Sequence, residues 1–249
     1  MVRRPGPRLA EGLVTHTKRT PVDVPLAERQ WVGYVAALRA NGWSTIEVPP
    51  ADECPDSVFV EDTMVVFRDL AVFARPGAAS RRPETTAAAQ AVAAQGHPIG
   101  HIQEPGTLDG GDVLKIGAKV YVGQGGRTNQ SGLEQLRAHL TPLGAEVVGV
   151  DVTKVLHLKS AVTALPDGTV VGYPEVVDDP SAYEMFLAVP EESGAHVVLL
   201  DDETVLMAAS APRTAAMFAE HGLRPVTVDI SEYERLEGCV TCLSVRLRG

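Results

Sequence analysis

The feature of this 249-residue chain that most restricts its fold is a repeated order of elements: two apolar strands around a turn, a helix, then a third strand. This order occurs four times, and such repetition is typical of similar units packed side by side. A fifth unit requires both chain ends, with a C-terminal strand at 242–247 that pairs near 12–15, ahead of a helix at 25–41. The hairpins are predicted at 58–74, 112–122, 161–172 and 196–208, and the helices that follow them at 83–95, 129–140, 181–187 and 212–221.

Two architectures agree with this order of elements. Five units around an axis would form a ring with few exposed strand edges and a central channel where loops converge. An open α/β sheet also alternates strands with helices, so periodicity alone does not choose between them. No linker or low-complexity segment divides the chain, so we predict one domain over residues 1–249.

The charge and the apolar pattern restrict the partners and the compartment. A formal net charge of −10 argues against nucleic acid or an anionic membrane surface as the main partner. There is no apolar run of about 18 residues, which a membrane span needs, and no secretory signal is expected from residues 1–10. Three cysteines give no disulfide framework and favour the cytoplasm.

Two acidic clusters are candidates for a site. In residues 52–63, five acids fall within eleven positions, and such carboxylates repel one another unless a cation lies between them. The cation could be a metal, an Arg or Lys, or a guanidinium ligand, but the absence of histidine there disfavours a transition metal. The alternative is a solvated loop. In residues 107–114, a Gly-Gly pair beside Asp109 permits close backbone approach, although a plain turn also explains it.

Four further residues are candidates with simpler alternatives. His157 begins a predicted apolar strand and could be an acid–base catalyst or a hydrogen-bonded core residue. Arg81 and Arg127 follow hairpins and could clamp a carboxylate, although most surface arginines do not. Cys242 lies at a junction of loop and strand and could be a nucleophile or a small buried residue. With Cys239 it forms a C-x-x-C, whose redox or zinc interpretation is disfavoured because no second pair exists.

Six short motifs occur in order along nearly the whole chain: PDSVFVED (55–62), RPGAASRR (75–82), LDGGDVL (108–114), GRTNQ (126–130), LHLKS (156–160) and TCLSV (241–245). With these motifs the chain resembles dimethylarginine dimethylaminohydrolase, a member of the guanidino-modifying superfamily. The resemblance implies a five-bladed α/β-propeller of repeated ββαβ units with pseudo-fivefold symmetry. It also implies hydrolysis of Nω-methylated arginine to citrulline and methylamine or dimethylamine, without a metal or other cofactor.

The resemblance also implies roles for single residues. Cys242 would be the nucleophile, His157 the general acid and base, and Asp109 the carboxylate that orients the imidazole. Glu237 stands where a relative carries aspartate, and its role is left open. The implied substrate-binding residues are Asp62 for the guanidinium, Asp56 for the substrate and its amino group, Glu61 in the same pocket, Arg81 and Arg127 for the carboxylate, and the carbonyl of Leu13 for the α-amino group.

Two other functions fit these residues. A deiminase acting on arginine or a related guanidine would release ammonia in place of dimethylamine. A non-catalytic binder of cationic amino acids would use the same acids without the thiol chemistry. A homodimer is left open as the oligomeric state.

Overall fold

Four three-stranded sheets surround a common centre in the structure, a computed structural model that describes residues 1–247. In each sheet an antiparallel hairpin is followed by a third strand parallel to the hairpin's second strand. All four predicted hairpins are confirmed. The strands are β1 (Met64–Phe67), β2 (Leu70–Phe73), β3 (Ile99–His101), β4 (Val113–Ile116), β5 (Lys119–Gln124), β6 (Glu146–Asp151), β7 (Val162–Ala164), β8 (Val170–Gly172), β9 (Phe186–Ala188), β10 (Val197–Leu199), β11 (Thr204–Ala208) and β12 (Arg224–Val228).

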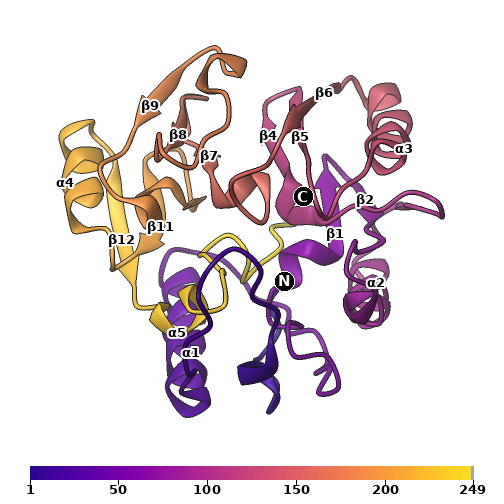
Figure 1. The fold of residues 1–249 in the computed structure, drawn as a ribbon, viewed down its shortest axis with the longest axis horizontal. Coiled ribbons are helices and arrows are strands. Elements are labelled where there is room, and N and C mark those ends of the chain that lie inside the picture. Colours follow the sequence, from indigo (N-terminus) through magenta and orange to yellow (C-terminus); the bar gives the residue numbers. More distant parts are fainter. Residues whose placement is uncertain (248–249) are drawn as a thin grey trace.

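The crossover helices lie on the outer rim of the molecule (Figure 1). They are α2 (Glu84–Ala93), α3 (Gln130–Leu140) and α4 (Pro212–Glu220). The helix predicted at 181–187 is wrong. A 3₁₀ turn at Pro180–Ala182 ends there, and β9 takes the residues after it. The Asp179 carboxylate caps the start of this turn by accepting from the backbone N–H of Ser181 at 2.9 Å, and the aromatic residues Tyr183 and Phe186 beyond it favour strand over further helix.

The fifth unit is built from both ends of the chain. The backbone N–H of Val245 donates to the Met1 carbonyl at 2.9 Å, and the Met1 ammonium donates to the Val245 carbonyl at 2.7 Å. Val2 forms a parallel bridge with Glu47. Helices α1 (Val24–Ala40) and α5 (Ser231–Glu234) cover this unit (Figure 1). The four sheets and this unit together make a five-bladed α/β-propeller.

The C-terminal segment differs from its prediction in two ways. Residues 242–247 form a turn and an irregular segment without a regular strand, and their partner is Met1 in place of residues 12–15. Residues 12–15 are held elsewhere, because the Leu13 N–H donates to the Asp56 carboxylate at 2.9 Å. Ring closure therefore occurs between the first and last described segments, at the molecular centre (Figure 1).

Hydrophobic packing places the C-terminal turn against helix α1. Trp31, Tyr34 and Leu38 on α1 share one buried cluster with Val240 and Leu243 of the turn. Burial of a side chain of this size contributes about 1.5–3 kcal/mol. The Tyr34 hydroxyl also donates to the Val240 carbonyl at 2.9 Å, so the turn has a fixed position in the centre of the ring. Among residues 1–247, no helix has the length and the apolar character that crossing a membrane requires.

Candidate active site

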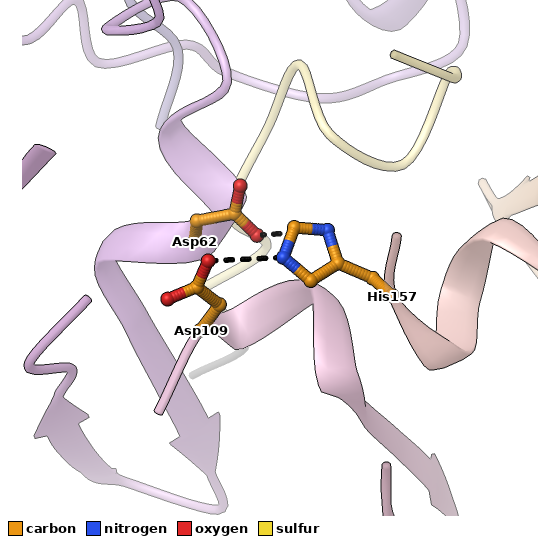
Figure 2. Close-up of side chains that lie close together, drawn as sticks. All are labelled: Asp62, Asp109 and His157. Atoms are coloured by element: carbon orange, nitrogen blue, oxygen red, sulfur yellow. Dashed lines mark hydrogen bonds and ion pairs between the residues drawn. The ribbon is translucent and has the colours of Figure 1, made fainter. Parts of the chain in front are cut away.

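Three 3₁₀ turns meet at the centre of the ring and carry the acids and the histidine (Figure 2). Asp62 lies within the turn Val60–Thr63, Asp109 precedes the turn Gly110–Asp112, and His157 precedes the turn Leu158–Ser160. His157 was predicted to begin a strand, but it begins this turn instead. Short turns suit a site because each aims one side chain inward and then leaves the centre.

The Gly-Gly pair lets these turns approach one another. A Cβ atom on Gly110 would lie 2.0 Å from the Glu61 carbonyl oxygen. One on Gly111 would lie 2.7 Å from Oδ1 of Asp62 and 2.8 Å from Nδ1 of His157. Any side chain at these two positions would push the turns apart, so the sequence argument from close backbone approach is confirmed.

His157 is buried between two carboxylates, both of which face its ring (Figure 2). Its Nε2 lies 3.0 Å from Oδ2 of Asp109, and its Nδ1 lies 3.9 Å from Oδ1 of Asp62. Burial by itself lowers the pKa of the imidazole, but the charge of Asp62 and the hydrogen bond to Asp109 outweigh it and raise the pKa to about 9. At neutral pH the ring is therefore an imidazolium that can give up a proton.

Asp62 is held by an arginine that is itself held by a second acid. Nη1 of Arg81 lies 2.6 Å from Oδ2 of Asp62, and Nη2 of Arg81 lies 2.8 Å from Oε2 of Glu84. Burial opposes the charge on Asp62, but His157 and Arg81 keep its pKa well below the usual range. Arg81 also donates to the carbonyls of Asp56 and Phe59, so most of its N–H groups already have partners.

A second chain of contacts fixes the far side of the histidine. Asp109 accepts from the Gly77 N–H at 2.9 Å, and Nη1 of Arg127 lies 3.4 Å from its Oδ2. Asp112 accepts from the Thr128 hydroxyl at 2.6 Å and from the N–H of the residue after His157 at 3.0 Å. Burial raises the pKa of Asp112 to about 6.

Cys242 reaches the same centre from the C-terminal turn. Its carbonyl accepts from the Glu61 N–H at 3.2 Å, which ties the turn to the 3₁₀ turn that carries Asp62. Its Sγ lies 3.3 Å from Sγ of Cys239. The hydrogen bond to Cys239 and burial raise the pKa of the Cys242 thiol, because both oppose a negative charge on its sulfur.

One small cavity joins most of the predicted residues. Asp109 does not line it, but lies behind the ring of His157. The predicted residues that line the cavity are Leu13, Asp56, Asp62, Arg81, Arg127, His157 and Cys242.

Glu61 requires a correction. It was expected in the same pocket, but its carboxylate lies 2.6 Å from Nζ of Lys159 and lines a separate cavity together with Thr241 and Arg246. Successive residues in a 3₁₀ turn point about 120° apart, so Glu61 and Asp62 cannot face the same side.

The positions of three side chains would allow a metal ion to bind here, but their charges do not require one. Asp62, Asp109 and His157 each place one potential ligand atom within 4.8 Å of the others. However, Arg81 and Arg127 already pair with the two carboxylates, and Asp109 already accepts a hydrogen bond from the histidine when the ring is protonated. The charge that a metal would neutralise is thus met by the protein itself.

Comparison with known proteins decides the family. No model of a protein family matches the chain. An N(G),N(G)-dimethylarginine dimethylaminohydrolase of Streptomyces coelicolor is 65% identical over 248 residues, which cover 100% of this chain and 96% of the relative. One of Pseudomonas aeruginosa is 35% identical over 250 residues, with 99% and 98% covered.

The chain belongs to the dimethylarginine dimethylaminohydrolase family. A solved dimethylarginine dimethylaminohydrolase, a histidine-to-glycine variant forming an adduct with S-methyl-L-thiocitrulline, matches it with a TM-score of 0.92 at 33% identity over 99% of this chain and 98% of that one. A cysteine-to-serine variant from Pseudomonas aeruginosa, complexed with citrulline, matches with a TM-score of 0.91 at 34% identity, covering 99% and 97%. The N-terminal domain of ArgZ, an arginine dihydrolase, shares the fold at 18% identity with a TM-score of 0.83, covering 98% and 96%.

Sequence reasoning missed several residues that support this dimethylarginine dimethylaminohydrolase site. Asp112 lies within the LDGGDVL motif and Glu84 follows RPGAASRR by two positions, but neither was assigned a role. Neither lines the cavity, since both act through the residues that do. Lys159 lies within the LHLKS motif, and its positive charge was a candidate partner for the acidic cluster at 52–63, where it pairs with Glu61.

Glu237, whose role was open, anchors residues 15–17, which follow Leu13 of the cavity lining. Its carboxylate accepts from the backbone N–H groups of Thr15 and Thr17 at 2.9 and 2.7 Å, and also from that of His16. Burial opposes its charge, but these hydrogen bonds lower its pKa. Glu237 adopts φ 61°, a left-handed conformation uncommon for a residue with a side chain, and it lines the cavity itself.

Proposed function

We propose that this chain hydrolyses Nω-methylated arginine, as dimethylarginine or monomethylarginine, to citrulline and dimethylamine or methylamine through a covalent thiouronium on Cys242. The observation that carries this proposal is a single cavity lined by the thiol of Cys242, the imidazolium of His157 and the carboxylate of Asp62. A relative that is 65% identical over the full chain supports the same reaction.

The substrate cation is bound by the acids of the cavity. Asp62 is ionised and accepts hydrogen bonds from the guanidinium nitrogens, while Asp56 adds a second carboxylate nearby. These acids fix the plane of the guanidinium and localise its charge, which makes the central carbon more electrophilic. Arg127 and the remaining donor of Arg81 bind the substrate carboxylate, and the carbonyl of Leu13 accepts from its α-amino group.

The first chemical step forms a bond from sulfur to the central carbon. The Cys242 thiol is protonated in the free site, and the arriving cation lowers its pKa because it favours the thiolate, so the thiol releases its proton to solvent. The thiolate attacks the guanidinium carbon to give a tetrahedral adduct. His157 donates its proton to the methylated nitrogen, which leaves as the amine, and a thiouronium remains.

The second step restores the enzyme. Neutral His157 takes a proton from water as the oxygen attacks the thiouronium carbon, and collapse expels the Cys242 sulfur as a thiolate. The new ureido oxygen of citrulline loses its remaining proton, and the sulfur takes one up to become a thiol again. Asp109 keeps the imidazole in place and stabilises its charged form in both steps. Acid–base catalysis of this kind typically contributes about 10²–10⁴-fold.

The proposal extends to partners and compartment. A methylated arginine is the small-molecule partner, and the net charge of −10 supports the absence of a nucleic-acid partner. The cytoplasm is the proposed location, because a nucleophilic cysteine must stay reduced and all three cysteines are free. Sedimentation of the purified chain tests the homodimer left open above.

A product assay tests the reaction. Citrulline and the released amine are measured with arginine, monomethylarginine and dimethylarginine, in the presence of a chelator. We expect citrulline with methylamine or dimethylamine from the methylated substrates, and none from Cys242→Ser. Cys54→Ser, which alters a thiol outside the cavity, is the matched control and should stay active. Ammonia from plain arginine as the main product would favour the deiminase, and full activity of Cys242→Ser would refute the proposal.

A further inference from the structure

The proposed reaction leaves one feature of the site without a role, which is the second cysteine of the C-x-x-C. Cys239 and Cys242 are the first and last residues of a tight turn, in which the Cys242 N–H donates to the Cys239 carbonyl at 3.1 Å. Their sulfurs lie 3.3 Å apart, and both thiols are free. The third cysteine, Cys54, lies in a different turn closed onto Ala51.

The backbone of this turn is compatible with a disulfide. The first and fourth Cα atoms of such a turn lie within about 7 Å of each other, and disulfides join Cα atoms about 4.4–6.8 Å apart. The sulfur separation of 3.3 Å exceeds a disulfide bond by only about 1.3 Å. Rotation of the two side chains toward each other can close such a gap, because the backbone already holds the ends together.

The two thiols differ in access. Cys242 lines the substrate cavity, whereas Cys239 lies behind it, with its sulfur 3.1 Å from the Thr241 hydroxyl and 3.9 Å from the Lys159 carbonyl. A small oxidant that enters the cavity therefore meets Cys242 first. The hydrogen bond from Cys242 lowers the pKa of Cys239 to about 6, so the pair can carry a thiolate near neutral pH.

We propose that Cys239 and Cys242 form a modification site for hydroperoxides, at which oxidation joins the two sulfurs and reversibly blocks the cavity. The bond itself does not depend on the proposed function. The loss of activity does rest on it, because it follows from the role of Cys242 as nucleophile.

The oxidation balances in two steps. The Cys242 sulfur attacks one peroxide oxygen, the O–O bond breaks, and the other oxygen leaves as an alcohol or water with the thiol's proton, which gives a sulfenic acid. The Cys239 thiolate then attacks the Cys242 sulfur and expels the hydroxyl group, which leaves as water with the former proton of Cys239. Overall, two thiols lose two electrons and two protons, and one peroxide is reduced.

Cys239 also protects the nucleophile in this scheme. A sulfenic acid without a neighbouring thiol is oxidised further to a sulfinic acid, which dithiol reductants do not reverse. A disulfide is reversed by them, because a dithiolate attacks one sulfur and releases both cysteines. The turn thus converts an oxidative lesion into a reversible state.

Thiol counts and intact mass test the bond independently of activity. The full chain, Cys54→Ser and Cys239→Ser are exposed to hydrogen peroxide, and thiols are titrated after denaturation. We expect the unaltered chain to fall from three thiols to one with a mass loss of about 2 Da. Cys54→Ser is the matched control and should fall from two thiols to none. Dithiothreitol should restore the thiols and citrulline formation in both.

Cys239→Ser should behave differently, because it lacks the second sulfur. It should gain about 32 Da as a sulfinic acid on longer exposure and lose activity that dithiothreitol does not restore. An unaltered chain that keeps its three thiols would overturn the proposal, and this result does not depend on whether the variant folds. An unaltered chain that gains oxygen as fast as Cys239→Ser would also overturn it. A disulfide that forms without loss of citrulline formation would instead overturn the block and the role of Cys242 together.

Discussion

The two halves of the site are held in place by different interactions. The charged half, which consists of Asp62, Arg81, Glu84, Asp109 and His157, is a buried network in which every member contacts an opposite charge. The C-terminal turn, residues 239–244, is held by backbone hydrogen bonds and apolar packing against α1. The side-chain partner of its nucleophile is another thiol.

The difference follows from the cost of burying charge. An unpaired buried charge costs several kcal/mol, so carboxylates that must be ionised at the site need fixed cationic partners. A thiol that is neutral in the free enzyme has no such need and tolerates a weak hydrogen bond. The charged half should therefore determine both stability and activity, whereas the turn should determine reactivity with less effect on stability.

The largest expected effect comes from removal of the imidazole. His157→Asn should lower kcat by about 10²–10⁴-fold, because no group remains to protonate the leaving amine. It should also destabilise the fold, since Asp62 and Asp109 lose the cation between them. Citrulline assays and urea unfolding measure both. Cys242→Ser is the matched comparison, with no citrulline formed and an almost unchanged unfolding midpoint. Equal destabilisation by both variants would break the contrast between the halves.

Loss of the charge on Glu84, which pairs with Arg81, should have the next largest effect. Glu84→Gln leaves a buried guanidinium partly unpaired, and breaking such a pair costs about 3–5 kcal/mol. Urea unfolding should show this loss, with a rise in KM because Arg81 no longer fixes Asp62. Glu104→Gln is the control, since it removes the exposed partner of Arg75 and should cost less than about 1 kcal/mol. Similar losses in both variants would contradict the buried network.

The pH dependence of stability should come mainly from the charged half. The pKa of His157 is raised to about 9 in the folded protein, above the value of about 6.5 in an unfolded chain. The folded state therefore binds the extra proton, and its stabilisation is complete below about pH 6.5 and is lost as the pH rises through about 9. The loss should be on the order of 3 kcal/mol.

Denaturant unfolding between pH 6 and pH 10 measures this loss, with His157→Asn as the reference that lacks the group. Asp112 adds a second fall in stability as the pH rises toward about 6, because its pKa of about 6 in the folded protein also exceeds its unfolded value. Stability that rises between pH 7 and pH 9 would contradict the charged imidazolium.

The smallest expected effect comes from Glu237, which anchors residues 15–17. Glu237→Gln keeps the shape of the side chain but removes the charge that accepts three backbone N–H groups. Weaker charge-assisted hydrogen bonds should raise KM by about 5-fold, with kcat nearly unchanged. Steady-state kinetics with dimethylarginine measure the split, and the control is Glu234→Gln, whose carboxylate accepts from the Ser210 hydroxyl and does not line the substrate cavity. A fall in kcat without a change in KM would place Glu237 in the chemical steps instead.

Much of the fold could be predicted because its signals are local. Turn residues such as Pro166-Asp167-Gly168 and apolar alternation determined the hairpins. The prediction of a helix at 181–187 failed because strand-forming aromatic residues outweighed a weak helical pattern. The residues of the site were predictable where a motif combined unusual chemistry with glycines, as at Asp109, since the glycines allow the approach that the chemistry needs.

The sequence by itself determined the repeating unit and the kinds of side chain that meet at the centre, because short-range patterns encode both. Only the tertiary structure decided that the ring closes between Met1 and Val245, that Glu61 faces away from Asp62, and that Cys239 lies against Cys242. Closure joins residues 244 positions apart. Such pairings depend on how the whole ring packs and on the direction in which each turn points, and neither is visible in a local pattern.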